Sequence, residues 1–88
     1  MRDAAAVSDA LWAAAAEWVR QQDRVPDARE VLNAMAQFAV EMGFTRRELQ
    51  AAVALDGRRW ERGDKRFAQP VGDAAFAGLV KRGRRGKR

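Results

Sequence analysis

Five residues in the second half of the chain could form specific hydrogen bonds and contacts from one face of an α-helix. They are Arg47, Gln50, Ala51, Ala54 and Arg58. An arginine can bond to guanine through two parallel hydrogen bonds, a glutamine can bond to adenine, and an alanine can touch a thymine methyl group. No acidic residue occupies these positions, although glutamate is usual on a solvated helix face. The pattern therefore favours an anionic partner.

The residue types that usually carry catalysis or bind metals are scarce. The chain of 88 residues has no His, Cys or Tyr. Its single serine and single threonine, Ser8 and Thr45, are both explained as helix N-caps. Without Cys or His, disulfides and the ordinary zinc and iron sites are excluded. We expect no enzyme, no cofactor, no metal site and no small-molecule substrate.

Charge is distributed unequally along the chain, whose net charge is +5. Residues 1–44 hold four arginines and seven acidic residues, a balance of −3, whereas residues 45–88 hold thirteen Lys or Arg and five acidic residues, a balance of +8. This asymmetry indicates a polyanionic partner. Nucleic acid is the commonest such partner, and an acidic membrane surface or an acidic protein comes next.

No segment has the composition of a membrane span or a secretory leader. A span needs about 20 apolar residues, but the longest uncharged run, residues 31–40, has ten. The N-terminus lacks the pattern of a signal peptide. We therefore expect a cytoplasmic location and no membrane partner.

The first predicted helix runs from about Asp3 or Ser8 to Gln22. Its apolar stripe at helical spacing comprises Val7, Leu11, Ala14, Ala15 and Trp18. Trp12 and Val19 lie about 100° from the centre of that stripe, so the core face is wide or the helix has a second interface. Trp12, Trp18 and Val19 are therefore a candidate surface for a dimer or a protein partner.

The second predicted helix has clear signals at both ends. Val25-Pro26 stops the preceding helix, and Asp27 followed by Glu30 has the spacing of a capping box. Gly43 supplies the left-handed residue that ends the helix. The predicted apolar face comprises Val31, Leu32, Met35, Phe38, Ala39 and Met42.

The third predicted helix starts at a second capping box, Thr45 with Glu48, and reaches about Arg62 if it continues through Asp56-Gly57. We expect Leu49, Ala52 and Val53 to face inward. A short fourth helix begins at Gly72-Asp73. The prediction is an all-α fold, a small bundle of three to four helices over residues 1–80, followed by a disordered basic tail over residues 81–88.

The junction of the second and third predicted helices resembles the helix-turn-helix of bacterial and phage DNA-binding proteins over residues 35–54. Gly43 matches the glycine of the turn and Ala39 the small residue where the two helices cross. The apolar positions of the pattern are matched by Phe38, Met42, Phe44, Leu49 and Ala52. The resemblance implies that the third helix enters the major groove.

The C-terminal segment Lys81-Arg82-Gly83-Arg84-Arg85-Gly86-Lys87-Arg88 resembles the minor-groove hook of AT-hook proteins, without its usual prolines. That resemblance implies that Arg82 and Arg84 enter a narrow A·T-rich groove while the neighbouring cations meet phosphates. A Gly/Arg segment is also compatible with RNA.

The leading hypothesis is a small DNA-binding accessory or transcription-regulatory protein of bacterial or phage type, with duplex DNA favoured over RNA. The candidate nucleic-acid-binding residues are Thr45, Arg46, Arg47, Gln50, Ala51, Ala54, Arg58, Arg59, Arg62, Lys81, Arg82, Arg84, Arg85, Lys87 and Arg88. The alternative is a helical protein-interaction module, such as a phage-type inhibitor or an assembly adaptor. It would use the tryptophans of the first helix and a basic face, and a homodimer is possible in either case.

Overall fold

The computed structural model describes the backbone of residues 2–85 and the side chains of residues 2–81. This part of the chain forms four α-helices and one short 3₁₀ helix and contains no strand. The elements are α1 (Ala4–Arg20), α2 (Ala28–Glu41), α3 (Arg46–Glu61), η1 (Gln69–Val71) and α4 (Asp73–Arg85). The predicted all-α fold is confirmed.

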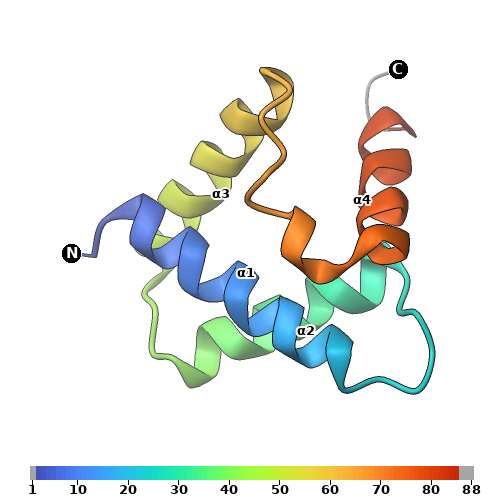
Figure 1. Ribbon diagram of the computed structural model, residues 1–88. Coiled ribbons are helices and arrows are strands. Elements are labelled where there is room, and N and C mark those ends of the chain that lie inside the picture. Colours follow the sequence, from blue (N-terminus) through green and yellow to red (C-terminus); the bar gives the residue numbers. More distant parts are fainter. Residues whose placement is uncertain (1, 86–88) are drawn as a thin grey trace.

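Helix α1 is the centre of the arrangement, because it packs against α2, α3 and η1. Figure 1 shows α1 crossing in front of α2, with α3 and α4 standing apart on either side. Helix α4 is held by α2 and η1. The space between α3 and α4 is therefore bounded by α2 and α1, and this arrangement positions the site described below.

The ends of α2 and α3 follow the local signals of the sequence. Asp27 accepts a hydrogen bond from the Glu30 N–H at 2.8 Å, and Thr45 accepts one from the Glu48 N–H at 3.1 Å, so both capping boxes are formed. Gly43 has a φ of 74°, which ends α2. The N–H of the following residue donates to the Ala39 carbonyl at 3.1 Å, as in a Schellman motif.

Of the two starts predicted for the first helix, the structure has the one at Asp3, so Ser8 is not an N-cap. The helix begins at Ala4, with Asp3 in the cap position and no side-chain hydrogen bond there. Ser8 lies in the second turn, only 1% exposed, and its hydroxyl donates to Asp56 of α3. The only serine therefore joins two helices.

The core is built largely from alanines, which allow the helices to approach closely. One cluster joins α1, α2, η1 and α4 and comprises Trp12, Ala15, Ala16, Ala28, Val31, Ala68, Val71, Ala75 and Leu79. A second joins α1, α2 and α3 and comprises Val7, Leu11, Ala39 and Ala52. The prediction that Val53 faces inward is wrong, since its side chain is 68% exposed. Within residues 2–85, no helix covers Val53 on that side of α3.

The candidate partner surface on α1 is largely taken up by the core. Trp12 is 7% exposed, and Trp18 and Val19 are half-buried and pack against the first core cluster. The physical reason is that η1 packs along α1, so the wide apolar face predicted for this helix serves intramolecular packing. Trp12 is therefore a core residue and not part of an exposed interface.

Helix α4 ends at Arg85, beyond the point where the predicted tail begins. Ala75 and Leu79 are buried, and Lys81 is exposed. The backbone of residues 81–85 continues the helix, and residues 86–88 lie outside the described part of the chain.

Candidate functional site

The outer side of α3 carries a stripe of exposed cations. Arg47, Arg58 and Arg62 are exposed and follow one another along the helix at spacings that keep them on one side. Among the residues that the structure describes, none of these three arginines lies within ion-pair distance of a carboxylate, since the four ion pairs involve Arg2, Arg20, Arg24 and Arg66. Their charge is therefore available to an external anion.

The other predicted contact residues of α3 are distributed around this stripe. Gln50 and Ala54 are exposed, and Ala51 is half-buried. Arg46 is exposed but lies towards the opposite side of the helix, where it lines a shallow hollow of about 380 Å³ together with Leu49, Gln50, Val53 and Ala54. The structure thus places most of the predicted α3 residues on the surface, with Arg46 displaced towards a neighbouring apolar feature.

The backbone donors at the N-terminus of α3 are bonded to side chains of the protein. The Thr45 hydroxyl accepts from the Glu48 N–H, and the Glu48 carboxylate accepts from the Thr45 N–H at 2.8 Å and from the Arg2 N–H at 2.7 Å. These backbone donors, that of Thr45 first, lower the pKa of Glu48 to about 2. The N–H groups of Thr45 and Glu48 are thus already bonded within the protein, which argues against Thr45 as a phosphate ligand.

The cations that follow in sequence are mostly engaged in local contacts. The Arg59 guanidinium lies 5.7 Å from the centre of the Phe67 ring, and the Lys65 ammonium lies 5.2 Å from that of Trp60. Arg66 forms an ion pair with Asp64 at 3.1 Å. Arg59 is half-buried and is thus a packing residue more than a free phosphate ligand.

The described part of the predicted C-terminal segment lies apart from α3. Lys81 is exposed near the end of α4, which Figure 1 shows standing away from α3. The backbone of Arg82, Arg84 and Arg85 is part of α4, and their side chains are outside the described atoms, as are Lys87 and Arg88 entirely. The predicted hook is therefore not brought together with the α3 stripe by the described residues.

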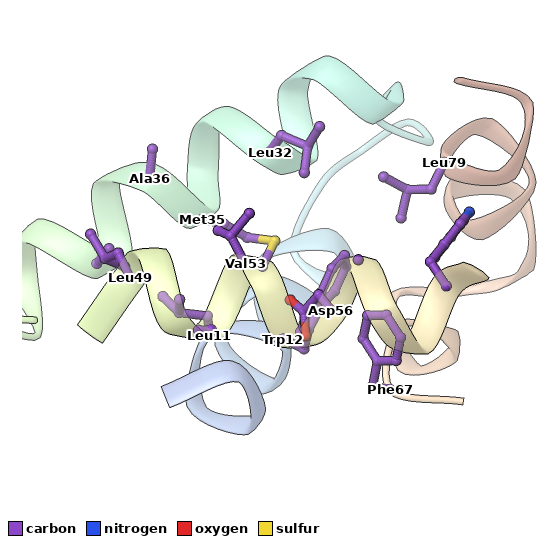
Figure 2. Close-up of a pocket in the computed structure, with 14 residues that line it drawn as sticks. Leu11, Trp12, Leu32, Met35, Ala36, Leu49, Val53, Asp56, Phe67 and Leu79 are labelled. Atoms are coloured by element: carbon purple, nitrogen blue, oxygen red, sulfur yellow. The ribbon is translucent and has the colours of Figure 1, made fainter. Parts of the chain in front are cut away.

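An apolar groove of about 630 Å³ lies between α2, α3 and α4, with α1 at its floor (Figure 2). Its apolar wall is formed by Leu11, Trp12, Leu32, Met35, Ala36, Ala39, Leu49, Ala52, Val53, Gly57, Trp60, Phe67 and Leu79. Among the described residues that line it, Asp56 is the only charged one. The groove joins the hollow beside Arg46 through the shared residues Leu49 and Val53.

Asp56 is held in the groove by two neutral donors from α1. The Ser8 hydroxyl donates to its Oδ1 at 2.6 Å, and the Trp12 indole N–H donates to its Oδ2 at 3.0 Å. Each carboxylate oxygen can accept a further hydrogen bond. In the described residues no cation forms an ion pair with Asp56. The groove thus combines an apolar wall with one uncompensated negative charge.

Sequence reasoning missed this groove and also the role of Arg2. The Arg2 guanidinium forms an ion pair with Glu48 at 3.1 Å and lies 5.1 Å from the centre of the Phe44 ring, so the N-terminus is tied to the α2–α3 turn. The sequence offered a signal for the groove: the apolar faces predicted for the second and third helices are wider than one contact with α1 can cover. It offered none for Arg2.

No membrane-crossing or metal-binding feature is found in the part of the chain that the structure describes. None of its helices has both the length and the apolar character needed to cross a bilayer. No three acidic side chains gather there as metal ligands would.

Comparison of the chain with family models, with curated proteins and with solved structures gives no match.

Proposed function

We propose that this chain is a small nucleic-acid-binding protein, acting as an accessory or regulatory protein on duplex DNA. The observation that carries the proposal is the stripe of exposed arginines on α3, Arg47, Arg58 and Arg62, which lack acidic partners among the described residues. An unpaired cationic stripe on a helix supplies the electrostatic part of binding to a polyanion.

The spacing of the stripe suits a duplex. Fifteen residues separate Arg47 from Arg62, which corresponds to roughly 22 Å along the helix axis at about 1.5 Å per residue. In the proposed complex α3 enters the major groove, Arg47 and Gln50 meet base edges, and Arg58 and Arg62 meet phosphates. The small side chains of Ala51 and Ala54 allow the backbone of α3 to approach the bases. Exposed Glu61, in the last turn, limits the contact at that end.

The test is a fluorescence-anisotropy titration of a random-sequence duplex at several salt concentrations. The two phosphate contacts of Arg58 and Arg62 correspond to a slope of about −1.8 in log K against log salt, a loss of about 12-fold between 50 and 200 mM. Replacing Arg58 by alanine is expected to reduce the slope by about 0.9. Arg29→Ala is the matched control, because Arg29 is an exposed arginine on α2 outside every ion pair of the described residues.

The contribution of the C-terminal cations is measured in the same titration. Substituting glutamine for Lys and Arg at residues 81–88 is expected to weaken binding to all sequences alike, whereas Arg47→Ala and Gln50→Ala are expected to relax sequence preference. An RNA duplex in a parallel arm decides between the two nucleic acids. The proposal is wrong if Arg47→Ala, Arg58→Ala and Arg62→Ala leave both the affinity and the salt slope at their wild-type values.

A further inference from the structure

The groove between α2, α3 and α4 exposes apolar surface that the chain itself does not cover. Val53 of α3 is 68% exposed and Leu32 of α2 is 38% exposed, and both belong to its wall. The part of the wall formed by α3 extends from Leu49 to Trp60, roughly 17 Å along the helix axis.

The charge inside this groove defines what could occupy it. Asp56 borders the groove, and its two hydrogen-bond donors, Ser8 and Trp12, are both neutral. The chain contains seventeen Lys and Arg, yet none of those in the described residues pairs with this carboxylate. A carboxylate facing an apolar groove gains most from a cation that is delivered there together with apolar surface.

We propose that the groove binds an amphipathic helix of a partner protein, whose apolar stripe carries one lysine or arginine that pairs with Asp56. A helix of about three turns spans the roughly 17 Å of the α3 wall. Its apolar side chains at positions i, i+4 and i+7 cover Leu32, Leu49 and Val53. The cation on the same stripe meets Asp56, while the stem of the lysine or arginine packs on Trp60, which is half-buried and lines the groove.

A helix matches the shape of the groove better than a small molecule does. Small ligands are usually enclosed on most of their surface, whereas this groove is open along the side where Val53 is exposed and continues into the hollow beside Arg46. An elongated, one-sided groove leaves half of its occupant in solvent, as a helix laid in a groove is.

A second copy of this chain is the competing occupant. In a symmetrical pair each Asp56 would need a cation from the other copy, and among the described residues that line the groove and the adjoining hollow that cation is Arg46. Arg46 and Asp56 are ten residues apart, roughly 15 Å along α3, so this pairing requires two antiparallel α3 helices in one particular register. The proposal commits to a helix of another protein, which can carry its cation at any position of its stripe, and the sedimentation measurement below decides between the two occupants.

The test uses a displayed library of helical peptides with a fixed three-turn apolar stripe and one randomised stripe position. The library is selected on the immobilised full chain and on three variants. Val53→Asp places a charge in the groove, and Val40→Asp is its matched control, since Val40 is an exposed helical valine, 79% exposed, outside the groove wall. Asp56→Asn removes the negative charge, and circular dichroism checks its fold.

The expected result is enrichment of lysine or arginine at the randomised position on the wild type and on Val40→Asp, and no enrichment of any peptide on Val53→Asp. A selected peptide is expected to bind Asp56→Asn about tenfold more weakly, as removal of one charged hydrogen bond predicts. Should Asp56→Asn fail to fold, the Val53 and Val40 variants and the residue preference still decide the question.

Three results would overturn the proposal: no peptide enriched on the wild type, enrichment without a preference for a cation, or enrichment that Val53→Asp leaves intact. Sedimentation that shows a wild-type dimer, lost in Val53→Asp but kept in Val40→Asp, would assign the groove to a second copy and overturn it as well. The proposal does not rest on DNA binding. The same variants are titrated with duplex DNA, so DNA binding is tested by the titration and helix binding in the groove is tested by the peptide selection.

Discussion

The hydrogen bonds at Asp56 predict a measurable coupling between α1 and α3. Ser8→Ala removes the donor of the 2.6 Å bond to Asp56 Oδ1. A hydrogen bond to a charged group contributes a net of roughly 1.5–3 kcal/mol. Because water from the groove can replace the lost donor, we expect Ser8→Ala to lower the free energy of unfolding by about 2 kcal/mol. In a domain of this size that corresponds to a fall in Tm of about 8–16 °C.

Removing the carboxylate is expected to cost more than removing the hydroxyl. Asp56→Ala leaves the Ser8 hydroxyl and the Trp12 indole N–H without an acceptor, and these residues are 1% and 7% exposed. An unsatisfied buried donor costs about 1–3 kcal/mol, so two of them give about 4 kcal/mol. In this background Ser8→Ala is expected to regain about 2 kcal/mol, because it removes one of the two unsatisfied donors. The coupling free energy is then about 4 kcal/mol.

The double-mutant cycle is measured by urea unfolding followed by far-UV circular dichroism, with a two-state fit for each variant. Asp9→Ala is the matched control, because Asp9 is an exposed acidic residue of α1 and its loss is expected to change the free energy of unfolding by less than about 0.5 kcal/mol. A cost of Ser8→Ala that is the same with and without Asp56 would refute the reasoning, since the two side chains would then act independently.

Two further predictions concern the helix ends and one helix interior. Gly43→Ala is expected to destabilise the chain by about 1–2 kcal/mol, because Gly43 has a φ of 74°. Gly57→Ala is expected to stabilise it by about 0.5–1 kcal/mol, because Gly57 lies inside α3 and nothing lies within 4 Å of an added Cβ. Thermal melts of the two variants and the wild type measure both effects. The pKa of Glu48 falls from an ordinary 4.5 to about 2 on folding, so its contribution to stability is complete above about pH 4.5 and is lost as the pH falls towards 2. Melting temperatures from pH 7 to pH 2 are expected to fall less steeply over that window in Glu48→Gln, and equal slopes would contradict this assignment.

The sequence predicted those parts of the fold that are decided within a few residues. The capping boxes at Asp27 and Thr45 and the left-handed Gly43 are set by hydrogen bonds and φ values local to each turn, and all three predictions are confirmed. For the end of α3 the sequence left two positions open, Asp56-Gly57 or the neighbourhood of Arg62, where Trp60 continues the apolar spacing, and the helix takes the second. Local chemistry of this kind leaves little for tertiary structure to change.

The sequence could not predict how much of each apolar face the neighbouring helices cover. Val53 and Ala52 are adjacent and both apolar, yet Ala52 is buried and Val53 is exposed, because α1 reaches only one side of α3. For the same reason Trp12 is enclosed beneath η1 instead of forming a partner surface. Ser8 was assigned to a cap because its partner, Asp56, lies 48 residues away in the sequence.

The two proposals use different sides of one helix. By the rotation of about 100° per residue, the stripe of Arg47, Arg58 and Arg62 lies roughly opposite the groove side of α3, where Val53 and Trp60 are found. A duplex on the arginine side would therefore leave the groove open to a partner helix. The three arginines line neither the groove nor the hollow, but Gln50 and Ala54, which are proposed to face DNA, also line the hollow beside Arg46. A partner helix confined to the groove is therefore expected to leave DNA in place, whereas one that extends into the hollow would compete with it.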